Sequence, residues 1–358
     1  MTARTLLRHG YLSVRGALLA PLALLRRPAV LPRPCRKILL VRVDRIGDLV
    51  LSTPFLRNLR QLLPSGEITL VGRAFAAELL HGGDLVDRIV VISPSGGVEA
   101  VGRLASEVFD LAVDLHYDYP LRTARLARRV RARCTAGFDI GGRGALFDVP
   151  VPARQRKHFV EETLDILRAL GLAPCRVPLE VHLRPQAADA SRSLLSCQGV
   201  GDPYVVFHPG GFYAEQRWPA PRFAQLADRI AELGLAPVLI GGKEDRPLLQ
   251  EIAGPMKANA ALICGQGVGV AAAAIAGSTL FVGNNSGPLH IACALDVPSV
   301  STLGPTDPVR FWPLSTRARV LRAERLDQLP VEDMLDVAKT ALASTPGRDD
   351  ARLARPAG

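Results

Sequence analysis

The sequence lacks several features that would assign it to other classes of protein. Its six cysteines are scattered, with no Cys-x-x-Cys pair and no histidine at metal-ligand spacing. Neither a disulfide framework nor a metal site is therefore predicted, and we expect reduced cysteines in a cytosolic setting. A sequence repeat with a fixed period of roughly 20 to 50 residues is also missing, which excludes a solenoid.

The overall composition is that of a globular protein. Apolar residues make up 48% of the 358 residues and charged residues 22%, which excludes both a disordered chain and a protein with many membrane spans. The length suits two domains, each large enough to bury a core of its own.

Acidic residues are missing from the N-terminal segment, because none precedes Asp44. The basic residues of this segment are Arg4, Arg8, Arg15, Arg26, Arg27, Arg33, Arg36 and Lys37. The apolar residues between them are Tyr11, Leu12, Val14, Ala17, Leu18, Leu19, Leu22, Leu24 and Leu25. This apolar set is too short and too interrupted to span a bilayer, which needs about 20 residues. We expect an amphipathic helix in the membrane interface, with arginines on lipid phosphates.

Two other interpretations of the N-terminal segment remain open. The segment fits a disordered basic arm, because arginines are spread along it. A secretory signal peptide also starts with basic and then apolar residues, but here a clean A-x-A cleavage site is missing and Arg15 interrupts the apolar run.

Short β-branched runs alternate with longer amphipathic segments from residue 37 onward, which predicts an α/β protein with parallel sheets covered by helices. In the first half the predicted strands are Ile38–Val43, Ile68–Gly72, Ile89–Ile92 and Leu111–Leu115, with a helix over Leu49–Leu63. The alternation restarts in the second half, with strands predicted at Tyr204–His208, Pro237–Gly241, Leu262–Cys264, Thr279–Val282 and Ser299–Leu303. Two Rossmann-like domains with parallel sheets facing a central cleft are therefore expected, and the ligands of such sheets bind beyond the carboxyl ends of the strands.

The division that we predict along the chain has five parts. They are a basic arm (1–36), a first Rossmann-like domain (37–184), a linker (185–203), a second Rossmann-like domain (204–343) and a frayed tail (344–358). The linker is placed in a polar segment rich in Ala, Ser and Gln, in which a short helix is also expected.

The loop after the first predicted strand carries a candidate catalytic acid. Gly47 permits a tight turn, and Asp48, near the start of the next helix, is placed to accept a proton from an acceptor hydroxyl. The alternative is that Asp48 only caps the helix. The G-x-G-x-x-G pattern of dinucleotide-binding dehydrogenases is missing here.

Glycines follow two strands of the second half. His208 precedes Gly210 and Gly211, whose backbone N–H groups, together with Arg217, suit a diphosphate; the alternative is a plain turn with a surface arginine. After the next strand, Glu244 is placed to bond a ribose hydroxyl, although a solvated acid at a helix start explains it equally well.

The clearest local signal is the segment VGNNSGPLH, in which a buried strand gives way to small residues and then to a helix. Ser286 and the amide of Gly287 lie where a helix N-terminus binds phosphate. His290 is placed to reach the same site, but a lone helical histidine is often a core residue. In the last loop, Thr306 is a candidate for bonding a base or ribose.

Arginines crowd the segment from Arg122 to Arg133, and Arg122, Arg125 and Arg129 share one face of a predicted helix. A solvated face is the usual meaning of such a run. An acidic acceptor is the functional alternative, whereas nucleic acid is not expected because no nucleic-acid-binding motif accompanies the charge.

Taken in order, four motifs resemble those of glycosyltransferase family 9, the heptosyltransferases of lipopolysaccharide core assembly, over roughly residues 37–325. The motifs are KILLVRVDRIGDLVLSTPFLRNLR, HPGGFYAEQRWPAPRFAQLA, LIGGKED and VGNNSGPLHIACALDVPSVSTLGPTDP. The resemblance implies a GT-B fold and an inverting transfer without an obligatory metal, with the acceptor on the N-terminal half and the nucleotide sugar, ADP-heptose, on the C-terminal half. It also implies a lipopolysaccharide core or related glycolipid as acceptor, at the cytoplasmic face of the inner membrane.

The resemblance extends to individual residues. Asp48 matches the catalytic base of the family, Ser286 and Gly287 match its diphosphate-binding turn, and Glu244 matches a nucleoside contact. The full predicted donor site is His208, Gly210, Gly211, Gln216, Glu244, Asn285, Ser286, Gly287, His290 and Thr306, and the predicted acceptor site is Arg45, Gly47, Arg122, Arg125 and Arg129.

Two residues depart from the pattern of the family. Gln216 stands where many members have a lysine, so we expect Arg217 to supply more of the stabilisation of the leaving group. Asn285 stands where the family commonly has an aspartate.

Two other functions suit the same two-domain plan. A nucleotide-sugar epimerase would need neither a lipid acceptor nor a basic arm, and a non-catalytic nucleotide-sugar-binding protein would not need the Asp48 loop.

Overall fold

The computed structural model describes residues 3–24, 30–93, 102–118, 120–153, 157–304 and 307–343, with the side chains of residues 3–9 left out. The chain divides into two compact units, Met1–His182 (unit 1) and Leu183–Gly358 (unit 2). The predicted tail 344–358 and Thr306 lie outside the described residues.

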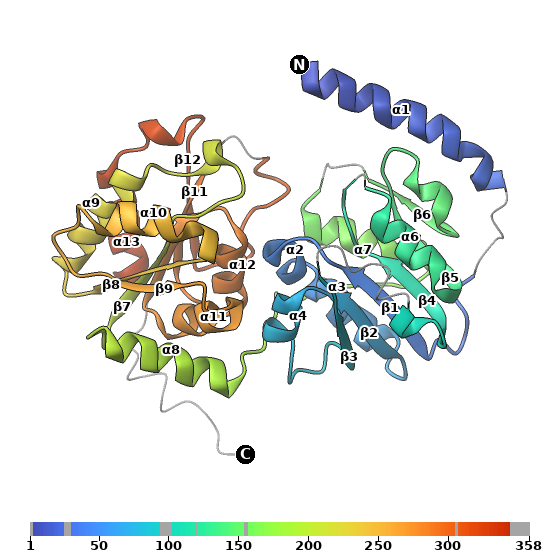
Figure 1. Cartoon of the computed structure of the whole chain (residues 1–358), viewed down its shortest axis with the longest axis horizontal. Helices are drawn as coiled ribbons and strands as arrows, with labels where there is room; N and C mark the ends of the chain where they lie inside the picture. The colour runs from blue at the N-terminus through green and yellow to red at the C-terminus, as the bar shows by residue number, and fades with distance from the viewer. Residues whose placement is uncertain are drawn as a thin grey trace. The chain divides into compact units, whose positions relative to one another are not determined.

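Unit 1 is built on a parallel sheet, which has six strands within the described residues, in the order β3-β2-β1-β4-β5-β6 (Figure 1). The strands are β1 (Lys37–Arg42), β2 (Glu67–Gly72), β3 (Arg88–Val91), β4 (Val108–Asp114), β5 (Arg131–Asp139) and β6 (Val149–Pro152). Central strand β1 pairs with β2 on one side and with β4 on the other, so its apolar run from Ile38 to Val41 is fully buried. A continuous apolar run is typical of a parallel strand that is covered on both faces.

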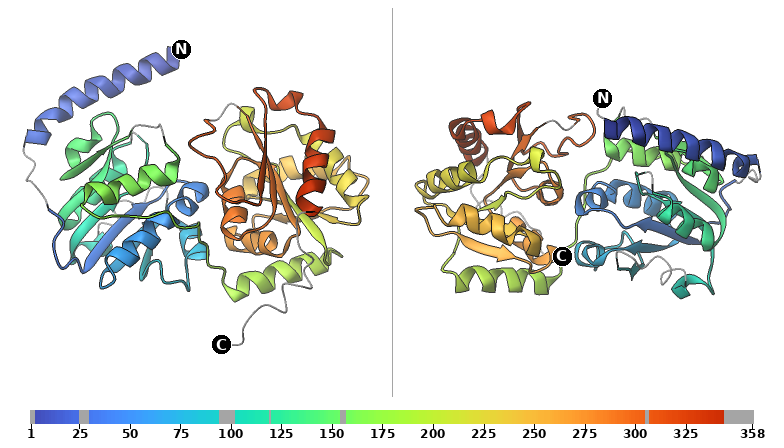
Figure 2. Two further views of the ribbon diagram at one scale, coloured as in Figure 1. Left: turned by 180° about the vertical axis from the view of Figure 1, so that it is seen from behind. Right: turned by 45° about the horizontal axis from the view of Figure 1, so that its top comes forward.

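Helices cover both faces of this sheet, as the two further views show (Figure 2). The helical elements of unit 1 are α1 (Ala3–Leu24), α2 (Ile46–Val50), α3 (Thr53–Leu62), α4 (Ala74–Leu79), α6 (Arg122–Arg129), the 3-10 turn η1 (Arg143–Leu146) and α7 (Phe159–Ala169). The single helix predicted over Leu49–Leu63 is wrong, because the structure has two helices there. Pro54 lies in the first turn of α3, and a proline is tolerated there but not inside a continuous helix.

Unit 2 repeats the plan with the strand order β12-β11-β10-β7-β8-β9, again parallel and six-stranded in the part of the chain that is described. The strands are β7 (Tyr204–His208), β8 (Ala236–Gly241), β9 (Ala261–Cys264), β10 (Leu280–Asn284), β11 (Ser299–Leu303) and β12 (Ala318–Arg322). The helical elements are α8 (Pro185–Cys197), η2 (Ala214–Gln216), α9 (Ala220–Ala231), η3 (Lys243–Asp245), α10 (Arg246–Ala253), α11 (Val268–Gly277), α12 (Gly287–Ala294), η4 (Leu326–Gln328) and α13 (Val331–Ala343).

The core of unit 2 fixes the loop that follows β7. Trp218 is 1% exposed, stacks edge-on against Phe223 with ring centroids 5.0 Å apart, and donates from its indole Nε1 to the carbonyl oxygen of Leu329 at 3.0 Å. A buried indole with its N–H satisfied is a strong anchor. The residues just before Trp218 are therefore held at the carboxyl edge of the sheet.

A close contact between β7 and α11 provides a test of this packing. The hydroxyl of Tyr204 donates to the carbonyl oxygen of Ala274 at 2.9 Å, and a Cβ on Gly277 would lie 2.1 Å from the same hydroxyl oxygen. We expect Gly277→Ala to lower the free energy of unfolding by about 1–3 kcal/mol through overpacking, measured by urea denaturation.

Gly201→Ala is the matched control for Gly277→Ala, because a Cβ there meets nothing within 4 Å. Tyr204→Phe combined with Gly277→Ala removes the clashing oxygen and should recover part of the loss. Equal stability of the Gly277→Ala variant and the wild type would contradict the contact.

Candidate functional site

The strand order of each unit reverses at one place, and open α/β sheets bind their ligands beyond the carboxyl ends of the strands at such a place. In unit 1 the reversal lies between β1 and β4, and in unit 2 it lies between β7 and β10. His208 ends β7, and Asp48 and Ser286 follow β1 and β10. Topology therefore places these predicted site residues at the reversal points of their sheets.

A buried arginine organises the reversal point of unit 1. Arg42, at the end of β1 and fully buried, donates from Nε and Nη2 to the carbonyl oxygen of Asp48 at 3.1 and 2.9 Å. Its Nη1 donates to the carbonyl oxygen of Leu115, just after β4, and to Oδ2 of Asp44 at 3.1 Å. A buried cation needs such partners, so Arg42 ties β1, α2 and the end of β4 into one rigid corner.

Asp48 lies in the first turn of α2 and is 5% exposed. Its Oδ2 accepts a hydrogen bond from Nε of Arg45 at 2.8 Å, and the side chain of Arg45 is 53% exposed. The N-cap residue of α2 is Arg45, without a side-chain capping bond, so the interpretation of Asp48 as the helix cap is wrong. The carboxylate is instead covered by a surface arginine, next to the half-buried Gly47.

A contact between Asp44 and a histidine, which no local sequence motif indicates, lies beside this corner. Oδ2 of Asp44 lies 3.2 Å from Nδ1 of His116, which follows β4. Burial acts to raise the pKa of Asp44, but the charge of Arg42 and the hydrogen bond from His116 outweigh it, so that the pKa is lowered. Asp44 is therefore an ionised group at the reversal point, and only the pairing of β1 with β4 brings His116 to it.

A second buried arginine fixes the loop between β4 and α6. Arg143 donates to the carboxylate of Asp114, to the carbonyl oxygens of His116 (2.8 Å) and Asp118, and to the hydroxyl of Thr123 at 3.2 Å. Arg143 and Asp114 are both fully buried. The start of α6, including Arg122, is thereby held at the carboxyl edge of the sheet.

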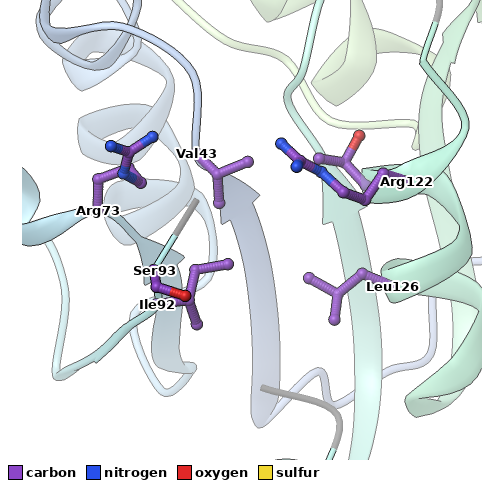
Figure 3. Close-up of a pocket in the computed structure, with 7 residues that line it drawn as sticks. Val43, Arg73, Ile92, Ser93, Arg122 and Leu126 are labelled. Atoms are coloured by element: carbon purple, nitrogen blue, oxygen red, sulfur yellow. The ribbon is translucent and has the colours of Figure 1, made fainter. Parts of the chain in front are cut away.

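A small pocket opens beside the start of α6. Its lining residues are Val43, Arg73, Ile92, Ser93, Arg122, Thr123 and Leu126. Arg73 and Arg122 lie on opposite sides of it, with Val43 between them (Figure 3). Of the arginines predicted to bind the acceptor, Arg122 lines this pocket, whereas Arg125 and Arg129 are exposed elsewhere on α6. The arrangement offers a pair of cations to an anionic group.

In unit 2, a buried amide joins the loops at the reversal point. Asn284, at the end of β10, is fully buried, and its Oδ1 accepts from the backbone N–H of Trp218 and from the hydroxyl of Thr302, both at 2.9 Å. Its Nδ2 donates to the carbonyl oxygens of Pro209 at 2.8 Å and Gly210 at 3.2 Å. One side chain thus positions the glycine loop, Trp218 and β11, a role that no local sequence motif indicates.

The predicted diphosphate turn is paired with His208. Ser286 is the N-cap residue of α12, and its hydroxyl lies 3.0 Å from Nδ1 of His208, so the structure brings these two predicted residues together. Burial lowers the pKa of His208 to about 4, Arg217 acts in the same direction, and Asp245 opposes them. His208 is therefore neutral at pH 7 and orients the Ser286 hydroxyl beside Gly287, the first residue of α12.

The guanidinium of Arg217 lies across the glycine loop. Its Nε donates to the carbonyl oxygen of Gly211 at 2.8 Å, and Nη2 contacts the same oxygen. Gln216 is half-buried beside it, in the short turn η2. These contacts therefore fix the glycine loop and the side chain of Arg217 relative to each other.

The other predicted donor residues have different environments. Glu244 is exposed in η3, while its neighbour Asp245 accepts a hydrogen bond from the backbone N–H of Gly242 at 2.9 Å. Asn285 donates from its amide to the carbonyl oxygen of Phe311 at 3.2 Å. His290 is 4% exposed, inside the packing of α12, so it is placed as a core residue and not as an open ligand contact.

Two parallel α/β units, each with polar loops at the reversal point of its sheet, are the architecture of the GT-B fold. The family model described as glycosyltransferase family 9 (heptosyltransferase) matches residues 100–341. The chain belongs to this family, and it is a glycosyltransferase.

Relatives and solved structures agree with this assignment. The chain is 26% identical to lipopolysaccharide heptosyltransferase 3 of Escherichia coli over 326 residues, which covers 85% of this chain and 94% of that protein. A glycosyltransferase family 9 structure from Veillonella parvula superimposes with a TM-score of 0.79 at 23% identity, covering 89% of this chain and 99% of that one. The E. coli ADP-heptose lipopolysaccharide heptosyltransferase II gives a TM-score of 0.76 at 21% identity, covering 86% and 98%. These similarities confirm the predicted fold class.

The lowered pKa of His208 predicts how the stability of the protein depends on pH. The unfolded chain binds a proton near pH 6.5 and the folded chain only near pH 4, so stability is complete above pH 6.5 and falls as the pH drops toward 4. We expect this residue to account for a loss of about 2 kcal/mol between pH 7 and pH 5.

Urea denaturation of the wild type and of His208→Asn across this pH range measures the contribution. The variant should lose that part of the pH dependence, whereas His81→Asn, a change at an exposed histidine, should keep it. Identical pH profiles for all three proteins would show that His208 is not buried as described.

Proposed function

We propose that this enzyme transfers a heptose from ADP-heptose onto a lipopolysaccharide core or a related glycolipid. The names of its relatives support this choice of donor and acceptor. The observation that carries the proposal is the placement of Asp48 at the reversal point of the unit 1 sheet, with its backbone carbonyl oxygen held by Arg42 and its carboxylate paired with Arg45.

In the proposed reaction, Asp48 takes the proton of an acceptor hydroxyl. The oxygen then forms a bond to the anomeric carbon of the sugar, while the bond from that carbon to the diphosphate oxygen breaks, and the configuration inverts. The diphosphate leaves with the electron pair of the broken bond. Because Arg45 covers Asp48, its ion pair must open first, and an anionic acceptor that attracts the exposed Arg45 would open it.

Unit 2 holds the nucleotide sugar in this proposal. The hydroxyl of Ser286 and the backbone at Gly287 meet the diphosphate at the start of α12, where the helix dipole favours negative charge. Neutral His208 keeps the Ser286 hydroxyl in place, and Arg217 stabilises the charge of the leaving group without an obligatory metal. Exposed Glu244 suits a ribose contact.

Unit 1 holds the acceptor. We propose that the pocket between Arg73 and Arg122 takes an acidic group of the acceptor, because two arginines facing each other suit phosphate or carboxylate oxygens (Figure 3). We also propose that the enzyme works at the inner face of the cytoplasmic membrane, through its basic N-terminal segment.

The proposed chemistry predicts a steep loss of turnover in Asp48→Asn. An amide cannot accept the proton, so kcat should fall by about 10²–10⁴ while the affinity for ADP stays within roughly twofold. The measurement is transfer of label from a panel of radiolabelled nucleotide sugars to extracted lipid acceptor, with calorimetry for the affinity.

Asp333→Asn is the matched control, because it makes the same chemical change at an exposed position of α13. Near-normal transfer by Asp48→Asn would disprove the assignment of the base. Label that appears in an isomerised free nucleotide sugar instead of in lipid would favour an epimerase, and saturable binding without turnover would favour a binding protein.

The acceptor pocket predicts unequal effects of the arginines of α6. Arg122→Ser should raise the KM for the acceptor roughly tenfold, because a charge-assisted contact is lost, and should leave the affinity for ADP unchanged. Arg125→Ser removes the same charge from an exposed position of the same helix and is the control. Equal effects of the two changes would indicate a diffuse arginine face in place of a pocket.

A further inference from the structure

Helix α1 is attached to unit 1 by one of its faces. Arg15 is 7% exposed, and it donates from Nε to the carbonyl oxygen of Gly141 at 2.8 Å and from Nη2 to that of Ile140 at 2.9 Å. Its guanidinium also lies 5.6 Å from the ring centroid of Tyr11. Arg15, which interrupts the apolar run of the N-terminal segment, thus makes a structural contact, and its side chain points into unit 1.

Glycines allow α1 to lie directly on the backbone of the turn before η1. A Cβ on Gly142 would lie 2.5 Å from Cα of Gly16, and a Cβ on Gly141 would lie 2.7 Å from Cδ2 of Leu12. Both glycines of the turn have positive φ, +55° at Gly141 and +82° at Gly142, which side chains rarely adopt. The docked face of α1 is therefore the one that carries Leu12, Arg15 and Gly16.

A different face of α1 presents large apolar side chains to solvent. Tyr11 is 57% exposed, Val14 62%, Leu18 74% and Leu22 42%, and their spacing of three and four residues places them in one row. We call these four residues the apolar stripe. A contiguous exposed row of this kind marks an interaction surface, whereas single exposed apolar residues are common.

Charge decides which partner suits this surface. No acidic residue precedes Asp44, so the helix and the segment after it carry only positive charge. A second copy of α1 would bring two cationic segments together, which opposes pairing of the stripe with itself. An anionic lipid surface complements both the charge and the stripe. None of the described helices is long and apolar enough to cross a membrane.

We propose that α1 lies flat in the interface of an anionic bilayer, with the apolar stripe inserted at the acyl boundary. This inference rests on the proposed membrane site of action and adds the surface that makes the contact. Because Arg15 and Gly16 hold α1 on the turn before η1, the helix fixes which side of unit 1 faces the lipid. A loose tether would leave that orientation undefined.

Sedimentation of the full chain with vesicles tests the proposal. The wild type should bind vesicles of phosphatidylglycerol and phosphatidylcholine and bind pure phosphatidylcholine weakly. Leu18→Glu should lower the partition coefficient roughly tenfold or more, because a large side chain can no longer be buried in the apolar boundary. Ala20→Glu adds the same charge two residues away, on an exposed part of α1 outside the stripe, and is the matched control with a smaller effect.

A second readout separates this proposal from the transfer reaction. Leu18→Glu should transfer sugar to a delipidated, water-soluble core acceptor as well as the wild type does, because Leu18 is 74% exposed on α1 and the residues of the proposed site lie on other elements. Failure of both proteins on that acceptor would overturn the proposed transfer, not the membrane contact. Equal vesicle binding by Leu18→Glu and the wild type would overturn the membrane contact. The membrane contact would also be overturned if light scattering showed that the wild type is an oligomer and that Leu18→Glu dissociates it. That result would assign the apolar stripe to contact with a second copy of the chain.

Discussion

The site of unit 1 depends on a cation that is buried at the end of its central strand. Arg42 has to be satisfied, since an unpaired buried charge is very costly, and the groups that satisfy it are the carbonyl oxygens of Asp48 and Leu115 and the carboxylate of Asp44. The arginine therefore sets the height of α2 above the sheet. It also holds the backbone of the short helix that carries the carboxylate of Asp48.

In unit 2 the loops of the site are held in position by a neutral side chain, that of Asn284, and not by a buried cation. Asn284 joins the loop after β7 to strand β11 by hydrogen bonds, and the neutral ring of His208 then orients Ser286. In the proposed function, the charge that meets a diphosphate comes from Arg217, at the partly exposed edge of the loop.

Most of the fold could be predicted from the sequence, because parallel strands that are buried on both faces appear as apolar runs. Strands β7 and β11 have the predicted bounds. The missed strands lie at or near sheet edges: β5 begins with exposed arginines, β6 contains two prolines, and β12 is only partly buried. The candidate site was only partly predictable. Local motifs indicate Asp48 and Ser286, but the pairing of Asp44 with His116 depends on strand order, which no local pattern contains. The proposed roles of these residues in catalysis stay predictions.

The amide of Asn284 has a consequence for chemical ageing. Its oxygen faces two donors and its nitrogen faces two carbonyl oxygens, so its orientation is fixed without ambiguity. Deamidation would replace that nitrogen with oxygen while leaving the shape of the side chain unchanged. Two carbonyl oxygens would then face a carboxylate oxygen, and the glycine loop would be pushed away from the strand that now holds it.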